Sequence, residues 1–463
     1  MLQSRNPEAG LLENTAKKQI VVIGAGITGL VAAYRLLQSG FSVILLESTL
    51  QLGGMAATFQ LGNEPLEYLY HHIFTSDRFL IDLAEELGVD HQLTWYNSRE
   101  ALYIGERLYP FVTPFDLIRF REIPFPQRIQ TGLTVLRAAG LTEWQALESC
   151  TAADWLSRQG GRQAYEKIWR PLLFAKFEDD AEKVSAVWIW NKFKLRGHSR
   201  EKSSGQSKLG YMTGGFGTLA TKLADRISAM GGRIYLGHTA TDILHAPDED
   251  RRFTISCILS DCNMVQFQAD GVIATIAGRQ FANIAGDLNL SKAYAQQVFD
   301  LHYKGNLCVV LRLRKSLSPY YWTTVCDDLP FVVVVEHTNL TGPERYGGHV
   351  VYLSRYLDAA SPLWTESDGE IFRLFTQALN RIFPDFTPDD ILDWRLRRTR
   401  YAQPVIGREY SKHMPAMDTT IPFLKLAGMA QIYPEDRGMN YAVRLGQQAA
   451  DAIKRDCITE GAP

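Results

Sequence analysis

The stretch Gln19-Ile-Val-Val-Ile23-Gly24-Ala-Gly26-Ile-Thr-Gly29 decides the fold of this 463-residue chain. Its first part, Gln19–Ile23, is a short β-branched run that predicts a buried strand, and the residues after the glycines carry apolar side chains at helical spacing as far as Gly40. A second apolar run, Phe41–Leu46, predicts the next strand. Residues 19–47 therefore predict a strand–helix–strand unit with parallel strands, the start of a doubly wound α/β sheet.

The three glycines of this stretch have the spacing of a dinucleotide-binding turn. Gly24 permits the tight turn, Gly26 lets the backbone approach a pyrophosphate, and Gly29 allows the helix to pack closely on the strand. The helix that begins at Ile27 and Thr28 offers free N–H groups and the positive end of its dipole to phosphate oxygens. The turn predicts that a dinucleotide binds here.

A second feature indicates which dinucleotide binds. Glu47 ends the second strand, where an acid accepts hydrogen bonds from both ribose hydroxyls and argues against the 2′-phosphate of NADP. Gly53-Gly54 follows shortly afterwards. With this pair the sequence resembles the flavin-dependent amine oxidase and protoporphyrinogen oxidase superfamily, in which an acid at the end of the second strand precedes a Gly-Gly pair near the cofactor phosphates. The resemblance implies FAD.

The resemblance recurs in the middle of the chain and near its end. Gly214-Gly215 resembles the return of the chain into the FAD domain, and the strand around His238–Ile243 would then meet the adenine side through backbone contacts, with Ala240 among them. Leu426-Ala-Gly428 followed by Gly438-Met-Asn-Tyr resembles the last motif of the superfamily, a glycine turn and a helix whose N-terminus faces the flavin pyrimidine. Such a helix end stabilises negative charge on a reduced flavin.

The resemblance implies a set of cofactor-binding residues drawn from these motifs. They are Gly24, Gly26, Ile27, Thr28, Gly29, Glu47, Ser48, Gln51, Gly53, Gly54, Met55, Ala240, Gly428, Met429, Gly438, Met439 and Asn440.

The sequence also departs from the superfamily. Arginines that usually follow the acid and the Gly-Gly pair are Thr49, Gln51 and Met55 here, so backbone amides must carry more of the phosphate binding. The acid that often follows the C-terminal glycine is Met429. The cysteine that binds flavin covalently is missing before the last helix, since Cys457 lies after it, and we expect noncovalent FAD.

Two resemblances on the substrate side point to different reactions. Lys167–Leu173 and Glu182–Ala186 resemble a segment of protoporphyrinogen oxidases and carotenoid desaturases, whose substrates are large and apolar. His71-His-Ile-Phe74 and Leu108-Tyr-Pro-Phe111 resemble motifs of UDP-galactopyranose mutases, which use reduced flavin as a nucleophile toward a sugar carbon. Both alternatives remain open at this point.

Three residues are candidates for catalysis. The match places His72 beside the flavin, where an imidazole can donate a hydrogen bond or accept a proton. Tyr433 and Arg437 lie between the last strand and the Gly438 turn, and Arg437 suits a substrate carboxylate or phosphate. Neighbouring His71 and His72 would face opposite sides of a strand, so we expect no metal site.

The predicted fold is α/β, with a Rossmann-type FAD-binding domain interleaved with a mixed α+β substrate domain. The segments expected for the FAD domain are 17–95, 208–285 and 395–463, and those for the substrate domain are 96–207 and 286–394. The polar stretch between Arg196 and Leu209 reads as a loop between them.

Composition excludes several other classes. A formal net charge of −2 argues against nucleic acid as a partner. The apolar run Phe331–Val335 is far shorter than the roughly 20 residues of a membrane-spanning helix. Met1–Lys18 has no apolar stretch of signal-peptide type, and the six dispersed cysteines indicate reduced thiols, so we expect a disordered leader and a cytoplasmic protein.

The segment Phe115–Leu141 mixes apolar side chains with arginines. This pattern suits either a lid over the substrate or peripheral contact with a membrane surface. Prolines within and beside the segment interrupt any long amphipathic helix, which favours the lid.

The resemblance and the motifs together predict a flavin-dependent oxidoreductase. The partner would be a small-molecule substrate of largely apolar character, which would lose hydride from a C–N or C–C bond to flavin N5. The alternatives are a sugar-nucleotide mutase and a flavoprotein without turnover. The identity of the substrate, the electron acceptor and the oligomeric state are left open by the sequence.

Overall fold

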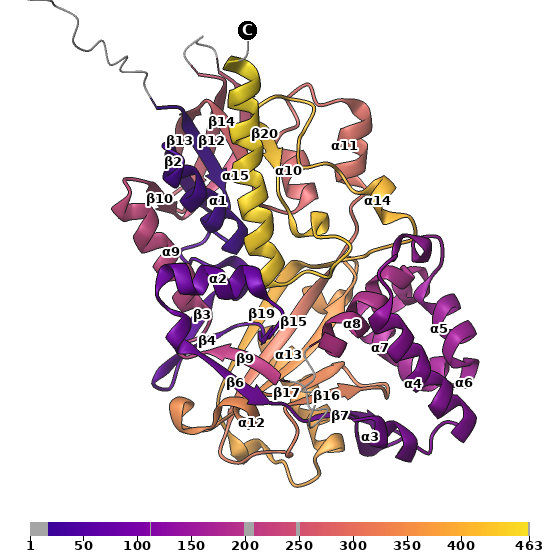
Figure 1. The fold of residues 1–463 in the computed structure, drawn as a ribbon. Coiled ribbons are helices and arrows are strands. Elements are labelled where there is room, and N and C mark those ends of the chain that lie inside the picture. Colours follow the sequence, from indigo (N-terminus) through magenta and orange to yellow (C-terminus); the bar gives the residue numbers. More distant parts are fainter. Residues whose placement is uncertain (1–16, 112, 199–207, 247–250, 462–463) are drawn as a thin grey trace, which may run out of the picture.

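The structure is a computed structural model that describes residues 17–111, 113–198, 208–246 and 251–461 (Figure 1). One of its sheets is five-stranded and parallel, with the strand order β10-β2-β1-β14-β20. Its strands are β1 (Gln19–Ile23), β2 (Ser42–Glu47), β10 (Arg233–Leu236), β14 (Gly271–Ala274) and β20 (Leu424–Leu426). Three distant parts of the chain thus build one sheet, as the predicted interleaving requires.

Side chains of the central strands point alternately to the two faces of this sheet, and both faces are buried. Ile20 and Val22 of β1 face one apolar core, whereas Val21 and Ile23 face the opposite core. The helices on the first face are α1 (Ile27–Gln38), α9 (Gly217–Ala229) and α15 (Met439–Gly461). The second face is covered by the antiparallel strands β11 (His238–His245), β12 (Phe253–Leu259) and β13 (Met264–Ala269) and by α10 (Gly278–Ile284) and α11 (Lys292–Phe299).

A seven-stranded sheet forms the second large layer, in the order β19-β15-β18-β17-β16-β7-β8. Its strands are β7 (Glu100–Ile104), β8 (Arg107–Pro110), β15 (Tyr303–Leu313), β16 (Trp322–Val325), β17 (Val333–Glu336), β18 (His349–Leu357) and β19 (Ile391–Pro404). Most neighbours are antiparallel, and α13 (Asp368–Ile382) packs its apolar face on this sheet.

A helical region lies beside the seven-stranded sheet (Figure 1). It contains α3 (Pro114–Arg119), α4 (Phe125–Gly140), α5 (Ala152–Gly160), α6 (Arg162–Ala164), α7 (Arg170–Phe177) and α8 (Ala186–His198). These helices share one apolar core, which includes Leu156, Ile168 and Trp190.

Smaller elements join the two sheets. They are α2 (Arg78–Leu87), α12 (Thr338–Thr341), α14 (Tyr410–His413), the hairpin β3 (Thr58–Leu61) and β4 (Glu64–Glu67), and the sheet of β5 (Ile73–Phe74), β6 (Leu93–Asn97) and β9 (Lys208–Met212). Glu67 connects several of them, because its buried carboxylate accepts hydrogen bonds from the Tyr211 hydroxyl and the Phe216 amide, while its carbonyl accepts one from Tyr352.

The structure confirms the predicted fold class and corrects some local expectations. The apolar spacing of residues 145–156 predicts one helix, and this prediction is wrong. A short 3-10 turn at Gln145–Leu147 is followed by α5, because the Thr151 hydroxyl accepts a hydrogen bond from the Asp154 amide and starts a new helix. Strand β19 runs across the expected boundary at 395. Cys457, expected after the last helix, lies within α15 because that helix continues to Gly461. Most of the expected leader (residues 1–16) and of the expected loop (residues 199–207) lies outside the described residues.

Candidate functional site

The glycine turn lies at the carboxyl edge of the parallel sheet. Gly24 has a φ of +103°, and a Cβ on Gly29 would lie only 1.9 Å from the Gly24 carbonyl oxygen, so the close approach of helix to strand requires glycine. Gly53 forms a bridge to Gly26, and its amide donates to the Ala25 carbonyl at 2.9 Å. A Cβ on Gly54 would come within 3.1 Å of the Gly26 Cα atom. The two glycine motifs of the sequence therefore form one surface.

Glu47 lies beside this surface, as the last residue of β2. Its side chain is buried, and Oε2 accepts a hydrogen bond from the Ala25 amide at 2.9 Å. Oε1 accepts from the amide and hydroxyl of Thr49, both at 2.9 Å. Each carboxylate oxygen has two lone pairs, so Oε2 keeps capacity for a further donor such as a ribose hydroxyl.

The other predicted residues of this region surround the same edge. Ile27 and Thr28 form the first turn of α1, whose N-cap residue Gly26 offers no side-chain hydrogen bond. Ser48 and Gln51 are exposed on the loop after β2, and Met55 lies in a 3-10 turn that starts at Gly54. The first amides of α1 have no partner within the helix and lie next to the Gly53-Gly54 turn.

Ala240 lies on β11, which follows β10 along the chain. Leu236 at the end of β10 pairs with Glu47, and the Gly237 amide donates to the Thr49 carbonyl at 2.9 Å. This register places the start of β11 beside the loop that carries Ser48 and Gln51.

The C-terminal motif lies at the same edge of the sheet. The Ala427 amide donates to the Ala274 carbonyl at 2.8 Å, which places Gly428 and Met429 just beyond β20. Gly438 precedes α15, whose residue Asn440 accepts a hydrogen bond from the Leu80 amide at 3.1 Å. Helix α15 then crosses α1 (Figure 1).

This arrangement fits the dinucleotide that the sequence predicts. Two glycine turns in contact leave no side chain between Gly26 and Gly54, an acceptor carboxylate stands at the end of β2, and an uncapped helix N-terminus lies between them. These are the parts that pyrophosphate and ribose groups require.

A buried charge cluster lies where the helical region, the seven-stranded sheet and the C-terminal segment meet. Asp436 Oδ2 accepts from Lys176 Nζ at 2.9 Å and from Lys192 Nζ at 2.5 Å. Asp436 Oδ1 accepts from the Gln403 amide at 3.1 Å. Arg437 donates to the side-chain oxygen Oε1 of Gln403 at 3.0 Å and to the Tyr356 hydroxyl at 2.8 Å. We call Lys176, Lys192, Asp436 and Arg437 the lysine–aspartate cluster.

The cluster has more positive than negative charge. Burial alone would raise the pKa of the Asp436 carboxyl, but Lys176 and Lys192 hold it well below its usual range. Burial lowers the pKa of Lys192 to about 8 in spite of Asp436, and repulsion from Lys176 adds to this. Three cationic side chains thus surround one carboxylate, so the cluster suits an additional anion.

The structure places His71 and His72 just before β5, and not within a strand as expected. Their rings still have different partners. His71 Nδ1 donates to the Leu69 carbonyl at 2.6 Å, and burial, together with nearby Arg437, lowers its pKa to about 4. His72 Nδ1 lies 3.0 Å from the Tyr321 hydroxyl.

Aromatic rings surround His72. Its ring packs edge-on against Phe74 and Trp322, with centroids 5.4 and 6.2 Å apart, and Tyr70 packs on Trp322 at 5.1 Å. Phe74, Trp322 and Tyr70 are only partly buried. This wall offers apolar contact area next to the histidine pair.

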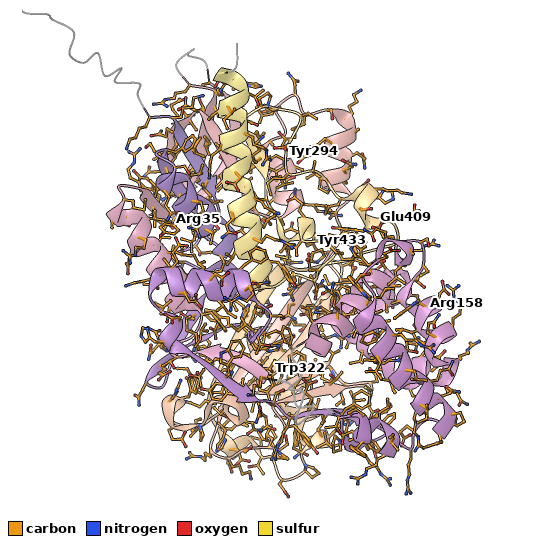
Figure 2. The ribbon with its side chains drawn as sticks, viewed as in Figure 1. Arg35, Arg158, Tyr294, Trp322, Glu409 and Tyr433 are labelled. Atoms are coloured by element: carbon orange, nitrogen blue, oxygen red, sulfur yellow. The ribbon has the colours of Figure 1, made fainter. Side chains whose placement is uncertain are left out.

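Tyr433 points toward the helical region. Its hydroxyl donates to Glu148 Oε1 at 2.6 Å, and its ring packs against Trp144 and Tyr410, with centroids 5.2 and 5.4 Å apart. Figure 2 labels Tyr433 near α14 and Trp322 on the seven-stranded sheet. The three predicted catalytic residues therefore belong to three different sets of contacts.

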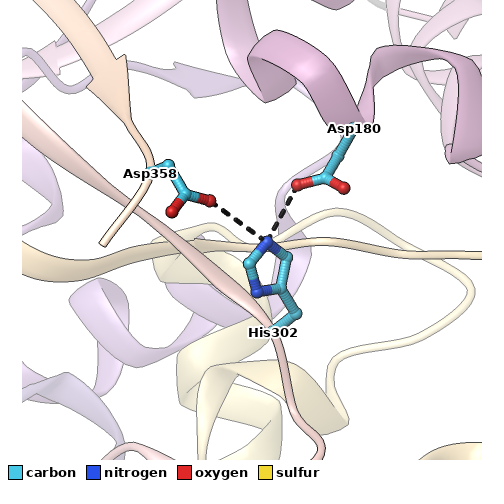
Figure 3. A group of neighbouring side chains, drawn as sticks. All are labelled: Asp180, His302 and Asp358. Carbon is cyan, nitrogen blue, oxygen red and sulfur yellow. Dashed lines mark hydrogen bonds and ion pairs between the residues drawn. The ribbon is translucent and has the colours of Figure 1, made fainter. Parts of the chain in front are cut away.

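Asp180, His302 and Asp358 bring ligand-type atoms within 4.8 Å of one another (Figure 3). His302 Nε2 lies 2.8 Å from Asp180 and 3.7 Å from Asp358. The buried Lys304 ammonium lies 2.8 Å from Asp180 and 3.1 Å from Asp358, so it supplies the positive charge that a metal would bring. We interpret this group as an ion-pair network. Lys304 takes part in this network through both of its ion pairs.

Comparison with known proteins decides the family. The family model described as flavin containing amine oxidoreductase matches residues 27–454. The chain belongs to this family. Family membership implies a flavin cofactor and an oxidoreductase. In the part of the chain that the structure describes, no helix is long and apolar enough to cross a membrane.

Individual relatives are distant. The 15-cis-phytoene desaturase of Narcissus pseudonarcissus is 23% identical over 409 residues, which cover 82% of this chain and 68% of that protein. A protoporphyrinogen oxidase-like protein from Exiguobacterium sp. 255-15 superposes with a TM-score of 0.73 at 17% identity, covering 95% of this chain and 99% of that one. A reduced UDP-galactopyranose mutase superposes with a TM-score of 0.71 at 16% identity, covering 95% and 96%. The two structural likenesses show the fold.

Sequence reasoning singled out Arg437 but missed most of its surroundings. Lys192, Gln403 and Tyr356 come from α8, β19 and β18, Asp436 comes from the loop before α15, and none of them carries a local motif. One signal was available, since Asp436 directly precedes the arginine that the glycine motif had already placed near the cofactor.

Proposed function

We propose that this protein binds FAD noncovalently and oxidises a largely apolar substrate by hydride transfer from a C–N or C–C bond. The observation that supports this most is the joined surface of Gly24–Gly29 and Gly53-Gly54 with Glu47 at its side. When bound, FAD supplies a hydride acceptor at N5. The chain itself supplies the amides of α1 for the pyrophosphate, Glu47 for the ribose and the helix end at Gly438–Asn440 for the flavin pyrimidine.

The proposed substrate region lies between the aromatic wall and the lysine–aspartate cluster. Tyr70, Phe74 and Trp322 would contact the apolar body of the substrate, and His72 would donate to a flavin or substrate heteroatom or accept a proton. Arg437 with Lys176 and Lys192 would hold an anionic group, because this cluster has an excess of positive charge. For Tyr433 we propose a positioning role, since its bond to Glu148 fixes the segment that leads to Arg437.

A sugar-nucleotide mutase is the second candidate. The same cationic cluster would also suit a diphosphate, and the fold likeness includes a mutase. Tyr109 of the second mutase-like stretch is engaged elsewhere, since its hydroxyl donates to Glu122 and its ring packs on Phe120. This favours the oxidoreductase. A flavoprotein without turnover is the third alternative, and a cytoplasmic location stays a prediction.

Anaerobic mixing separates these functions. Apolar amines, porphyrinogens, polyenes and sugar nucleotides are added one at a time to the oxidised protein while the flavin absorbance is followed. An oxidoreductase loses the oxidised-flavin absorbance in proportion to its substrate. A mutase leaves it unchanged and converts a nucleotide sugar only after chemical reduction, without consuming reductant. A protein that no metabolite reduces, and that converts no sugar when reduced, is the non-catalytic flavoprotein.

A further inference from the structure

Helix α4 has its large apolar side chains outside and its small residues inside. Phe125, Ile129, Leu133 and Leu136 follow one another at spacings of four, four and three residues, which places them on one stripe of the helix. Their exposed fractions are 57%, 43%, 45% and 69%. The residues that α4 buries are Thr131, Thr134 and Ala138. A helix that packs only on its own protein would show the reverse pattern.

The inner face of α4 is fitted to its neighbours. The Thr131 hydroxyl lies 3.5 Å from the Gly160 carbonyl at the end of α5, and a Cβ on Gly160 would lie 3.6 Å from that hydroxyl. The Thr134 hydroxyl donates to the Gln130 carbonyl at 2.9 Å. The buried hydroxyls are thus satisfied, and rotating α4 by half a turn would drive Leu133 or Leu136 against Gly160. The outward stripe is therefore a fixed feature of the packing.

Helix α3 extends the stripe. Phe115 and Ile118 are 71% and 40% exposed. Arg128 of α4 donates to the Ile118 carbonyl at 2.7 Å, which holds the end of α3 against α4. We call Phe115, Ile118, Phe125, Ile129, Leu133 and Leu136 the α3–α4 face. The described residues include sixteen exposed large apolar side chains, and six of them lie on α3 and α4. Exposed apolar side chains are therefore concentrated on these two helices.

The charges around this face are mainly positive. Arg119, Arg121 and Arg137 are exposed on the same two helices and their connection. The acids of this segment are engaged: Asp116 accepts from the Thr113 amide at 2.7 Å, and Glu122 accepts from the Tyr109 hydroxyl at 2.7 Å. An apolar face rimmed by arginines is complementary to lipid headgroups of negative charge above an acyl layer.

The sequence favours a lid here because of its prolines, but Pro126 lies in the first turn of α4, where proline is tolerated, and the helix runs unbroken for 16 residues. We propose that the α3–α4 face docks in the plane of an anionic membrane surface. The stripe from Phe125 to Leu136 is about 16 Å long, at the rise of an α-helix, so it can lie along the interface and cannot cross it. Helices α3 and α4 lie at the edge of the molecule far from the parallel sheet (Figure 1). Docking there leaves the carboxyl edge of the parallel sheet accessible. The inference does not depend on the proposed function.

Co-sedimentation with lipid vesicles tests this proposal. The full protein is mixed with vesicles of phosphatidylcholine alone or of equal parts phosphatidylcholine and phosphatidylglycerol. We expect binding to the anionic vesicles, weakened by salt. Replacing both side chains in F125S/L136S should lower the partition coefficient at least about tenfold, because two large apolar side chains no longer enter the acyl layer. R121E/R137E should lower it about tenfold or more on anionic vesicles and little on neutral ones.

The control removes an equally exposed apolar residue elsewhere. Ile458 on α15 is 72% exposed, and I458S should bind vesicles as the unchanged protein does. All replaced side chains are exposed, so thermal unfolding should change little. The proposal is wrong if the unchanged protein does not bind anionic vesicles, or if F125S/L136S binds them as strongly as the unchanged protein. It is also wrong if light scattering shows a dimer that F125S/L136S dissociates while vesicles bind neither protein, because a second copy then covers the face.

Discussion

Glu47 is the residue that links the glycine turn to the sugar of the predicted cofactor. Its two oxygens organise the Ala25 amide and Thr49, and Oε2 keeps an acceptor site. Glu47→Ala removes charge-assisted hydrogen bonds of about 1.5–3 kcal/mol each, so FAD affinity should fall at least about tenfold. Reconstitution of the apoprotein with FAD, followed by flavin fluorescence, measures this.

The matched control for Glu47 is a carboxylate away from the site. Glu86 forms an ion pair with Arg35 on the outer side of α1 and α2, and Glu86→Ala should leave FAD affinity unchanged. Equal affinity of Glu47→Ala and the unchanged protein would remove Glu47 from the cofactor site.

The lowered pKa of Lys192 leads us to expect that anion binding depends on pH. Its pKa is lowered to about 8, so the ammonium is charged below this pH and loses its proton above it. Lys176, Arg437 and Asp436 surround it, Asp77 adds a more distant carboxyl, and Asp436 stays ionised throughout the range. The dissociation constant of an apolar carboxylate such as 1-naphthoate should therefore rise about tenfold between about pH 7 and pH 9.5.

Lys192→Arg is the matched variant for this measurement. A guanidinium stays charged over the whole range, so the pH dependence of binding should become clearly weaker and should then reflect Lys176, whose pKa burial also lowers. Calorimetric titration at several pH values gives the comparison. A flat profile for the unchanged protein, or the same slope in Lys192→Arg, would exclude Lys192 as the anion-binding group.

At the scale of elements, the crossing of α1 and α15 holds the two ends of the chain together. A Cβ on Gly446 would lie 2.5 Å from the Thr28 carbonyl oxygen and 2.9 Å from the Val31 Cβ atom. Gly446→Ala must push α15 away from α1, and we expect a loss of about 1–3 kcal/mol in unfolding free energy. Urea unfolding followed by circular dichroism measures it.

Gly369 on α13 is the control for the helix crossing. No atom lies within 4 Å of a Cβ built there, so Gly369→Ala should be neutral or stabilise by up to about 1 kcal/mol. If Gly446→Ala is as stable as Gly369→Ala, the two helices do not approach as closely as described.

The sequence predicted helices and strands best where a pattern within a few residues determines the structure. The run Gln19–Ile23 and the glycines after it became β1 and the start of α1, because alternation and turn chemistry act within a few residues. The resemblance implied only that both glycine motifs lie near the cofactor phosphates, and the direct bridge between Gly26 and Gly53 is a finding of the structure. In contrast, Lys192 and Gln403 meet Asp436 only through the packing of three distant segments, which no local pattern encodes. The outward stripe of α4 was visible as a mixed pattern, but its direction depends on Gly160.

At the scale of the whole molecule, the lysine–aspartate cluster joins the helical region to the C-terminal segment. Asp436 is almost fully buried and forms ion pairs with two ammonium groups. Asp436→Asn leaves these charges without a counterion, so the unfolding free energy should fall by about 3–5 kcal/mol. The triple variant K176M/K192M/D436L removes the carboxylate together with both ammonium groups, leaves Arg437 with its Gln403 and Tyr356 partners, and should regain most of this loss.

An exposed ion pair provides the control for the cluster. Asp82 pairs with Arg78 on the surface of α2, where Asp82→Asn should cost less than about 1 kcal/mol. If Asp436→Asn is no more harmful than Asp82→Asn in urea titrations, the cluster does not hold the parts of the molecule together.

The central claim is that the carboxyl edge of the parallel sheet binds FAD without a covalent bond. The most direct measurement is to purify the protein, record its absorbance, denature it with acid, and identify the released chromophore by chromatography and mass spectrometry. We predict a yellow protein that releases one equivalent of FAD and leaves a colourless polypeptide of unmodified mass. A colourless protein that binds only a nicotinamide nucleotide, or flavin that stays attached to the denatured chain, would contradict the account.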